Sequence, residues 1–475
     1  MRGRIAGWSG GTGGRWRMMS KRSSLLTKQL VLLIVLVLFL ITIVGHHRDA
    51  FINARLETSH QAQFLGLIEG DHELFWCDRS QFRTDICNMK GDIRMLTFNG
   101  NKPIVLYAKD PATSSVTEIV KPYTRKWEKS CMDTVHEVTL RIVPANSQTD
   151  KTPCDVHHKV PGVVFSTSGY TGNLFHEFND GLIPLFITSQ HLKGEVVFII
   201  TEFHNWWLTK YFEVLQQLSQ YEIISFENDT RVHCFPELEV GLHIHDDLTV
   251  DPNRMPNHES IRDFRKLLDR GYENALRFDS PIPDVSKPKL SIIVRNGTRK
   301  FLNLGDIVTT AEELGFNVSL LSPDPTMELK RLFQLLNSTD VLMGVHGAAM
   351  THFLFMKPGK VLIQVIPLGI DWASTTYYGK PTKKMGLHYL PYKILPSESS
   401  LSRQYNASDP ILVNPDEIFN QQGWWTMKKI FLEGQDVRPS LTRMRKIFMR
   451  ALKKLKRPVT PPQSSRTATK GGLID

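Results

Sequence analysis

The amino-acid sequence predicts an α/β protein with two domains, and three observations support this prediction. The chain has 475 residues, which is more than one hydrophobic core usually serves, because single cores stop growing near about 250 to 300 residues. From Leu290 to Ile366, short apolar strands alternate with helical patterns, as they do in the βαβ units of a parallel sheet. Strands and helices also alternate in the first half, although less regularly.

The first domain is expected to span residues 73–280. Short apolar runs predict its strands, and apolar residues at helical spacing predict its helices. The predicted strands are 104–107, 138–143, 163–166, 196–200 and 223–226, and the predicted helices are 174–190 and 207–218. Two polar and proline-containing stretches, near 255–260 and 281–289, bracket a basic helix and mark the expected boundary.

The second domain is expected to span residues 281–456. Its predicted strands are 290–294, 317–321, 340–344 and 360–366, and its predicted helices are 305–314, 326–336 and 348–356. A basic amphipathic helix at 439–455 is expected to close this domain by packing on it, rather than to bind a membrane or nucleic acid. The tail, 457–475, has the composition of a disordered segment.

The net charge of +10 comes from the two ends of the chain. Residues 1–48 carry eight Lys or Arg and no acid, and residues 438–475 carry eleven against one acid. With +8 and +10 at the ends, the total of +10 leaves −8 for the residues between them. An acidic main body does not suit a phosphate backbone, so we expect no nucleic-acid partner.

An apolar segment of fifteen residues, Leu30–Val44, follows the first basic block. It predicts a cytosolic tail at 1–29, a single N-terminal transmembrane helix that acts as a signal anchor at 30–45, and a polar stem at 46–72. The same segment also fits the core of a cleaved signal peptide. Both alternatives place the main body in the secretory lumen, because the basic residues stay cytosolic.

Cysteines and glycosylation sequons agree with a lumenal main body. The cysteines are Cys77, Cys87, Cys131, Cys154 and Cys234, and the sequons are at Asn228, Asn296, Asn317, Asn337 and Asn406. Disulfides persist in this compartment, and at least one of five cysteines must be unpaired within the chain. Without a CxxC pair, the sequence does not favour a zinc site.

A turn of small residues follows the strand at 340–344 and contains Gly344, His346, Gly347 and Ala348. At the junction of a strand and a helix, small side chains let an anion approach the free N–H groups of the helix N-terminus. His346 can donate one more hydrogen bond. The alternative is tight packing of the helix on the strand around a buried histidine.

A basic loop follows the strand at 290–294 and carries Arg295, Arg299 and Lys300. The carboxyl ends of parallel strands meet at one edge of the sheet, where ligands bind, so this loop should lie beside the small-residue turn. Arginine forks and a lysine ammonium are suited to phosphate. The alternative is a solvated basic loop. A loop that grips phosphate is a poor glycan acceptor, which argues against glycosylation of Asn296.

A third candidate lies after the strand at 163–166, where a glycine-rich turn leads into a helix with Asn173 as its cap. His176 and Asp180 are four residues apart and share a helix face, so the carboxylate can orient the imidazole as a general base. Glu177 is a further candidate for the base. Pro184 removes a helical hydrogen bond from the carbonyl of Asp180 and should kink the helix. The alternative is an ordinary surface pair.

The sequence contains no strict DxD motif, and Asp246-Asp247 is the nearest approach. This absence disfavours a divalent metal bound to a diphosphate and favours neutralisation by arginine, lysine and helix N–H groups. We therefore expect no cofactor and no obligatory metal.

Several sequence blocks together resemble glycosyltransferase family 61, in particular its plant branch of xylan arabinosyl- and xylosyltransferases. The blocks are CDRSQFRTDIC with GDIR, KPYTRKWEKSCM, GYTGNLFHEFNDGLIPLF, VRNGTRKFLN, GVHGAAMTHFLFMKPG and MGLHYLPYKI. The resemblance implies a GT-B fold of two Rossmann-like domains, with the acceptor side in the first and the nucleotide sugar in the second. It also implies inversion at the anomeric carbon without an obligatory metal.

Carried onto this chain, the resemblance assigns the family's N-terminal site residues to Asn173, His176 and Asp180. Its donor loop and small-residue turn correspond to Arg295–Lys300 and Gly344–Ala349. We therefore expect a type II Golgi membrane enzyme that transfers arabinofuranose or xylose from a UDP-sugar to xylan. Two alternatives stay open: a transferase of the same family that acts on N-glycans or proteins, and a non-catalytic Golgi subunit that binds glycan or stabilises a synthase complex.

Overall fold

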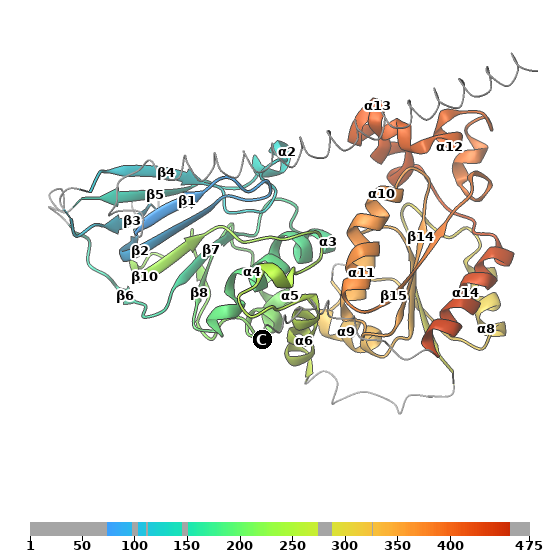
Figure 1. The fold of residues 1–475 in the computed structure, drawn as a ribbon, viewed down its shortest axis with the longest axis horizontal. Helices are drawn as coiled ribbons and strands as arrows, with labels where there is room; N and C mark the ends of the chain where they lie inside the picture. Colours follow the sequence, from blue (N-terminus) through green and yellow to red (C-terminus); the bar gives the residue numbers. More distant parts are fainter. Residues whose placement is uncertain are drawn as a thin grey trace, which may run out of the picture. The chain divides into compact units, whose positions relative to one another are not determined.

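The computed structural model describes residues 74–96, 103–110, 113–144, 151–273, 287–324 and 326–456. The predicted cytosolic tail, signal anchor, stem and C-terminal tail lie outside these ranges. Within the described ranges, no helix combines the length and the apolar character needed to cross a membrane. The described residues all belong to one compact unit, which contains two β-sheets with helices packed around them (Figure 1).

The first sheet has the strand order β4-β5-β3-β2-β10-β7-β8-β9, with β1 paired to β2 and β6 paired to β10. The half formed by β10, β7, β8 and β9 is parallel. In the other half, β2 pairs antiparallel with β10, β3 and β1. The strands are β1 Phe75–Asp78, β2 Ile86–Met95, β3 Ile104–Tyr107, β4 Val116–Val120, β5 Val138–Val143, β6 Val156–His157, β7 Gly162–Ser166, β8 Val197–Thr201, β9 Ile224–Ser225 and β10 His233–Val240.

Two disulfides fasten the antiparallel part of this sheet. Cys77 and Cys87 face each other on β1 and β2 and are bonded, and Cys154 is bonded to Cys234 on β10. The fifth cysteine, Cys131, is free and buried. Four of the five cysteines therefore pair, and one is left over, as the odd number requires.

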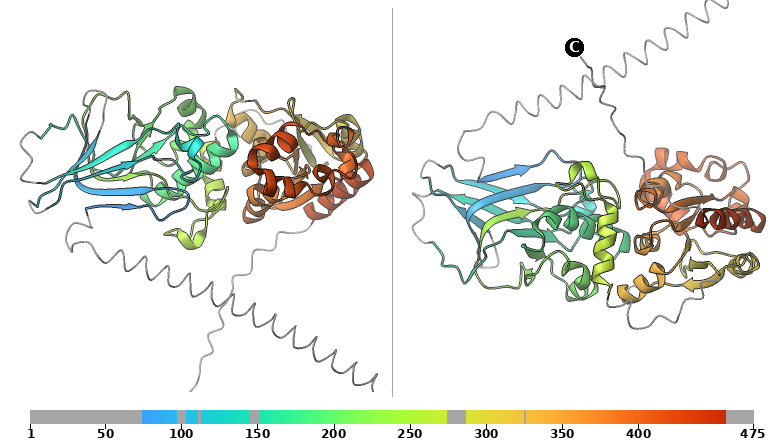
Figure 2. Two further views of the ribbon diagram at one scale, coloured as in Figure 1. Left: turned by 90° about the horizontal axis from the view of Figure 1, so that it is seen from above. Right: turned by 60° about the horizontal axis from the view of Figure 1, so that its bottom comes forward.

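Helices cover the parallel half of the first sheet on the side of the second sheet (Figures 1 and 2). They are α3 Leu174–His176, α4 Ile183–Ser189, α5 Asn205–Leu215 and α6 Ile261–Gly271, and the π-helical turn η2 Glu177–Leu182 joins α3 to α4. The sequence predicts a helix kink at Pro184. The structure has this π-helical turn there, and the turn ends directly before α4. The hydroxyl of Thr124 donates to the carbonyl of Asp180 at 2.8 Å and so supplies the hydrogen bond that Pro184 cannot.

The second sheet is parallel throughout, in the order β12-β11-β13-β14-β15. The chain passes from β11 outward to β12 and then returns to the other side of β11 as β13. The topological switch point, where sheets of this kind bind ligands, therefore lies between the carboxyl ends of β11 and β13. The strands are β11 Lys289–Ile293, β12 Asn317–Leu321, β13 Val341–Val345, β14 Val361–Ile366 and β15 His388–Lys393.

The helices of the second half include the 3₁₀ helix η5, which directly follows β13. The others that matter here are α8 Leu304–Glu313, α9 Leu329–Asn337, η5 Ala348–Phe355, α10 Asp371–Ser374, the π-helical turn η6 Thr375–Gly379, α13 Pro415–Met427 and α14 Leu441–Leu455. The basic helix α14 buries Met444, Ile447, Phe448 and Ala451 in the core of the second sheet. The prediction that this helix packs on its own domain is confirmed.

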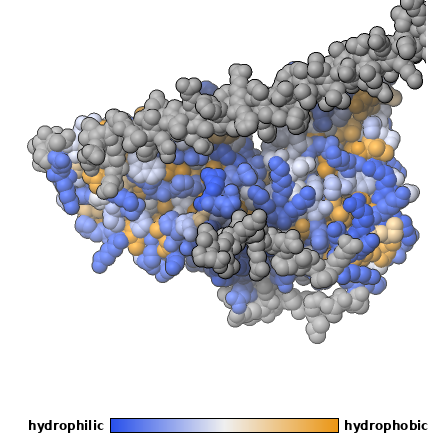
Figure 3. All heavy atoms as spheres, viewed as in Figure 1, coloured by the Kyte–Doolittle hydropathy of each residue, from blue (hydrophilic) through white to orange (hydrophobic). Residues whose placement is uncertain are grey.

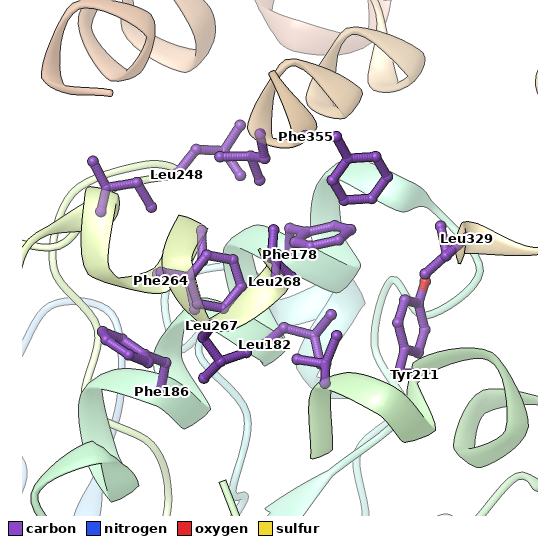
Figure 4. Close-up of a cluster of buried hydrophobic side chains, with 14 of the residues drawn as sticks. Phe178, Leu182, Phe186, Tyr211, Leu248, Phe264, Leu267, Leu268, Leu329 and Phe355 are labelled. Atoms are coloured by element: carbon purple, nitrogen blue, oxygen red, sulfur yellow. The ribbon is translucent and has the colours of Figure 1, made fainter. Parts of the chain in front are cut away.

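One hydrophobic cluster joins the helices of the first half to those of the second. Figure 4 shows Phe178 of η2 between Phe264 of α6 and Phe355 of η5. The ring centroids of Phe178 and Phe355 lie 5.9 Å apart. In addition, the buried Arg265 of α6 donates to the carbonyls of Phe355 and Met356 at the end of η5, at 3.0 and 3.1 Å. This packing brings the glycine-rich turn after β7 and the small-residue turn after β13 into one region.

On the face shown in Figure 3, the visible hydrophobic residues form small separate groups among hydrophilic residues. Scattered apolar side chains are normal on a protein surface, so each exposed aromatic residue has to be judged from its own neighbours.

Candidate active site

The site begins at the switch point of the second sheet. Arg295 and Arg299 lie in the loop after β11, and Gly347 lies in the turn after β13. A Cβ atom built on Gly347 would be 2.5 Å from Nη1 of Arg295 and 3.5 Å from Nη1 of Arg299. Both guanidinium groups therefore converge on the backbone of the small-residue turn, as predicted from the positions of the two loops in the sequence.

The loop itself fixes the two arginines. Nε of Arg295 donates to the carbonyl of Thr298 at 2.9 Å, and the backbone N–H of Arg299 donates to the carbonyl of Gln435 at 2.9 Å. Arg299 has a φ of 58°, which is in the left-handed region that costs a residue with a side chain free energy. A strained backbone that holds a charged side chain in place is typical of a binding site.

Arg295 and Arg299 have no carboxylate in salt-bridge contact within the part of the chain that the structure describes. Among the described residues, neither Arg295 nor Arg299 forms a salt bridge, and the buried Nε of Arg299 has no hydrogen-bond partner. Burial, together with the neighbouring charge of Arg295, lowers the pKa of Arg299 to about 10, and burial also lowers the pKa of Arg295. Two half-buried cations that form no salt bridge among these residues are suited to an anion, because a bound anion would reduce their repulsion and their desolvation cost.

Gly347 itself starts the helix that faces the arginine pair. Its φ is 155°, and the first hydrogen bond of η5 runs from the N–H of Met350 to the carbonyl of Gly347 at 2.9 Å. The N–H groups that precede this bond, including that of Ala348, have no partner inside the helix. The hydroxyl of Tyr378 also donates to the carbonyl of Gly347, at 2.9 Å, and holds the turn in place.

His346 is a neutral hydrogen-bond donor beside the same turn. The amide nitrogen of Gln364 lies 2.9 Å from Nδ1 of His346, and the amide oxygen of Gln364 accepts from the hydroxyl of Tyr389 at 2.7 Å. Nδ1 is therefore an acceptor, and the proton of the ring is on Nε2. Burial, followed by the charges of Arg299 and Arg295, lowers the pKa of His346 to about 3.

Two of the predicted donor-site residues have other partners. The ammonium group of Lys300 lies 3.9 Å from Oδ2 of Asp436, so its charge has an acidic neighbour. Gly344 is buried in β13, and a Cβ atom there would be 2.7 Å from Sδ of Met350. The small size of Gly344 thus allows η5 to pack on the strand, which was the alternative considered for the turn. Contacts of these two residues with a ligand stay a prediction.

His176 and Asp180 form a hydrogen-bonded dyad at the start of η2. Nδ1 of His176 lies 2.6 Å from Oδ2 of Asp180, and the histidine side chain is 16% exposed while the aspartate is fully buried. An aspartate that accepts from Nδ1–H leaves the lone pair on Nε2, where it can accept a proton. This geometry is compatible with His176 as a base and with Asp180 as the residue that orients its ring.

Arginines surround the buried carboxylate of Asp180. Nε of Arg125 donates to Oδ2 at 2.8 Å, Arg83 lies 3.8 Å from Oδ1, and the amide of Asn179 donates to Oδ1 at 2.7 Å. Burial alone would raise the pKa of Asp180, but the hydrogen bond from His176 and the charge of Arg125 lower it below its ordinary value. Asp180 is therefore a carboxylate in the resting protein.

Glu177, the other candidate for the base, uses both of its carboxylate oxygens in hydrogen bonds within the protein. One carboxylate oxygen accepts from the N–H of Gly172 and the other from the indole N–H of Trp207, both at 2.6 Å. Burial raises its pKa. These bonds fix the glycine-rich turn to α5, and Asn173 caps α3 by accepting from the N–H of Phe175 at 3.0 Å. Both residues shape the turn on which His176 is mounted.

The two clusters are linked by aromatic contacts. Phe175, next to His176, has its ring centroid 6.1 Å from that of Tyr378, which holds the carbonyl of Gly347. A cavity of about 760 Å³ lies between the glycine-rich turn and the start of η5. It is lined from the first half by the turn 169–174 and Lys210, and from the second half by Ala348, Ala349 and His352. A cavity of this size is typical of sites for small-molecule ligands.

Arg83 and Arg125 were not predicted as parts of the site. They lie in the blocks CDRSQFRTDIC and KPYTRKWEKSCM, far in sequence from Asp180, which both contact. The signal available was the presence of an arginine in each block, and nothing in the spacing tells which carboxylate it meets.

One other group of side chains has metal-ligand spacing among the described residues. The ligand atoms of His136, Glu202 and Glu227 lie within 4.8 Å of one another. Glu202 already accepts from the hydroxyl of Ser166 at 2.9 Å. None of these residues contacts the arginine pair or the dyad in the interactions described above, and we assign them no part in the site.

Comparisons with known proteins show which family this chain resembles. The model of the family Glycosyltransferase 61 matches residues 174–363, a range that contains the dyad, the arginine pair and the small-residue turn. A xylan glycosyltransferase of Arabidopsis thaliana is 49% identical over 393 residues, which cover 80% of this chain and 79% of that protein.

Two relatives come from Oryza sativa subsp. japonica. An alpha-1,3-arabinosyltransferase is 40% identical over 80% of this chain and 65% of its own length. A beta-1,2-xylosyltransferase is 38% identical over 79% of this chain and 83% of its own length. Among solved structures, an iron-containing heptosyltransferase has a TM-score of 0.29 at 12% identity, over 64% of this chain and 81% of that one, which is too low to carry an argument.

Proposed function

Because the chain belongs to glycosyltransferase family 61, we propose that it transfers a pentose, arabinofuranose or xylose, from a UDP-sugar to a xylan chain. The main support is one observation: an arginine pair that forms no salt bridge among the described residues converges on a helix N-terminus, and a His-Asp dyad lies in the same region. Relatives with 38% to 49% identity are named as xylan glycosyltransferases, arabinosyltransferases or xylosyltransferases, and these names supply the acceptor and the sugar.

The donor side of the mechanism belongs to the second sheet. The diphosphate of the donor lies against Arg295, Arg299 and the N–H groups of the turn at Gly347 and Ala348. Nε2–H of His346 donates one more hydrogen bond to it. Negative charge develops on the leaving phosphate as the glycosidic bond breaks, so fixed cations and N–H groups stabilise the transition state more than the ground state. Lys300 and Gly344 are weaker candidates for contact with the diphosphate of the donor.

The acceptor side belongs to the dyad. Nε2 of His176 takes the proton from a hydroxyl group of the acceptor, and the oxygen of that hydroxyl attacks the anomeric carbon of the pentose. A new glycosidic bond forms as the bond between that carbon and the phosphate oxygen breaks, and UDP leaves with the electron pair. Attack opposite the leaving group inverts the anomeric configuration. Asp180 stabilises the imidazolium that results, as the aspartate does in a Ser-His-Asp triad.

Membership of the same family also supports proposals on the domains, the cellular location and the metal requirement of the enzyme. We place the first sheet in an acceptor-side Rossmann-like domain at 73–280 and the second in a donor-side Rossmann-like domain at 281–456, arranged as a GT-B fold. The enzyme would be a type II Golgi membrane protein with its catalytic part in the lumen. The arginine pair supplies the charge that a metal would otherwise supply, so we propose that no metal is obligatory.

The test of this proposal uses purified full-length chain in detergent. It is incubated with UDP-arabinofuranose or UDP-xylose and a set of xylo-oligosaccharides, and the products are weighed by mass spectrometry. A mass increase of one pentose, with release of UDP, is expected for one of the donors. The same test with N-glycan acceptors checks the alternative acceptor class. Absence of both transfer and donor hydrolysis, with the protein folded, would instead support a non-catalytic subunit.

A further inference from the structure

An exposed pair of aromatic rings lies on the first half of the protein. Phe82, in the loop after β1, is 71% exposed, and Trp127, just before helix α2 Lys129–Met132, is 39% exposed. Their ring centroids are 5.0 Å apart and the planes differ by 13°. Neither residue belongs to a hydrophobic core cluster. A stacked pair outside the core leaves one face of Phe82 open to solvent.

The two arginines that contact Asp180 of the dyad also contact this aromatic pair. The guanidinium carbons of Arg83 and Arg125 each lie 5.2 Å from the centroid of the Trp127 ring, within the range of a cation–π contact. Both arginines also contact Asp180, at 3.8 and 2.8 Å. Each of these arginines therefore contacts both Trp127 and the carboxylate of Asp180, which orients His176.

The charge around the aromatic pair is balanced, unlike that around the donor site. Arg83 pairs with Asp247 at 3.1 Å, and Arg125 pairs with Glu128 at 3.2 Å, in addition to their contacts with Asp180. Arg295 and Arg299 form no salt bridge among the described residues. The surface at Phe82 thus suits an uncharged partner, whereas the donor site suits an anion.

We propose that Phe82, backed by Trp127, is an acceptor subsite that stacks on a sugar ring of the xylan chain next to the ring that receives the pentose. The flat face of a β-linked pyranose presents C–H groups, which pack on an aromatic ring, and its hydroxyl groups stay in water. This inference rests on the proposed function, because it takes the dyad as the point where the acceptor reacts. It adds a residue that sets the preference of the enzyme for long acceptors.

The experiment compares Phe82→Ala and Phe82→Tyr with Trp425→Ala in full-length chain. Trp425 is a matched control, since it is 69% exposed and lies in α13 of the second half. Transfer is measured with xylobiose and xylohexaose at saturating donor. We expect Phe82→Ala to raise the KM for xylohexaose by about threefold to tenfold, as the loss of one aromatic stacking contact predicts. The tyrosine variant should restore the lower KM, and Trp425→Ala should resemble the wild type.

A second readout does not depend on catalysis. In native electrophoresis through a gel that contains soluble xylan, binding retards the protein. The Phe82→Ala variant should be retarded less than the wild type, and Trp425→Ala should be retarded equally. Equal retardation and an equal KM for Phe82→Ala, or equal losses in both alanine variants, would overturn the subsite. Failure of the wild type to hydrolyse any UDP-sugar would overturn the proposed function instead, and the gel would still test glycan binding at Phe82.

Discussion

Gly347 and Arg295 are in such close contact that no side chain fits between them: a Cβ atom on Gly347 would lie 2.5 Å from Nη1 of Arg295. The two residues are 52 positions apart in the sequence and end neighbouring strands, β13 and β11. Their contact places a cation against backbone N–H groups at the switch point of the sheet, where an anionic ligand is expected. Glycine at this position keeps the space that such a ligand needs.

The first prediction concerns Gly347. In Gly347→Ala, the methyl group collides with Arg295, and the φ of 155° becomes strained. We expect the KM for the UDP-sugar to rise at least about tenfold, because the guanidinium must move away from the diphosphate. Gly305→Ala, in α8, is the control, since nothing lies within 4 Å of a Cβ atom there. Unchanged donor kinetics in Gly347→Ala would show that the turn does not contact the donor.

The second prediction separates the base from the donor site. In His176→Gln, the acceptor hydroxyl loses its proton acceptor, so we expect kcat to fall by about 10²- to 10⁴-fold while UDP still binds. Steady-state transfer to xylo-oligosaccharides measures the first quantity and calorimetry the second. The exposed His191→Gln serves as the control. Full turnover in His176→Gln would assign the base to another group.

The third prediction concerns the stability that Asp180 contributes. Its folded-state pKa lies below its ordinary value of 3.8, so the unfolded chain takes up a proton first as the pH falls. The stabilisation is therefore fully present above the unfolded-state pKa and is lost as the pH falls through the folded-state pKa. At pH 6 to 7, Asp180→Asn should lower the free energy of unfolding by about 3 to 5 kcal/mol, because it removes the fully buried carboxylate that Arg125 and Arg83 both contact.

Urea unfolding at a series of pH values checks this dependence on Asp180. The difference between wild type and Asp180→Asn should shrink as the pH falls below the ordinary pKa of an aspartate. Asp133→Asn removes only the surface pair with Lys129 and should behave like the wild type. A difference that stays constant down to the lowest pH would mean that the charge of Asp180 does not stabilise the fold.

The fourth prediction follows from the disulfides. With Cys77–Cys87 and Cys154–Cys234 closed and Cys131 buried, the native protein should react slowly with iodoacetamide, since a buried thiol is protected and its pKa is raised by burial. After unfolding without a reductant, one thiol per chain should react, and peptide mass mapping should find it at Cys131. Labelling at any other cysteine would contradict this pairing.

Much of the fold could be predicted from the sequence where the local pattern agrees with the final environment. The four strands predicted in the second half are present within one residue of their predicted ends, and the segments 104–107 and 138–143 coincide with β3 and β5. Among them, β3, β13 and β14 are short apolar runs that are buried along their whole length, so the sequence pattern and the burial give the same answer.

Strands β1, β2, β4, β6 and β10 were not predicted, for a physical reason. β2 contains Lys90, Gly91 and Asp92, which interrupt its apolar pattern, and β10 has a bulge between Phe235 and Glu237. Such strands are stabilised by pairing with distant neighbours, and short-range patterns carry no information on that pairing.

For the candidate site too, features set by local sequence could be predicted and contacts between distant residues could not. The loops with Arg295 and Gly347 could be placed together because parallel strands end at one edge of a sheet. The contacts of Asp180 with Arg83 and Arg125 bridge 97 and 55 residues of sequence, and no local rule relates them. The choice between His176, Glu177 and Asp180 also needed the structure, because only the hydrogen bonds show which side chain keeps a free lone pair.

The central claim is that the arginine pair binds the diphosphate of the donor and that the dyad acts on the acceptor. The most direct measurement is the dissociation constant of UDP, by calorimetry, for wild type, Arg295→Ala, Arg299→Ala and His176→Gln, with the surface variant Arg445→Ala as a control. The account predicts that UDP affinity falls by about tenfold or more in each of the first two variants, as for a lost charged hydrogen bond, and stays at the wild-type level in the other two. Wild-type affinity in both Arg295→Ala and Arg299→Ala would contradict it.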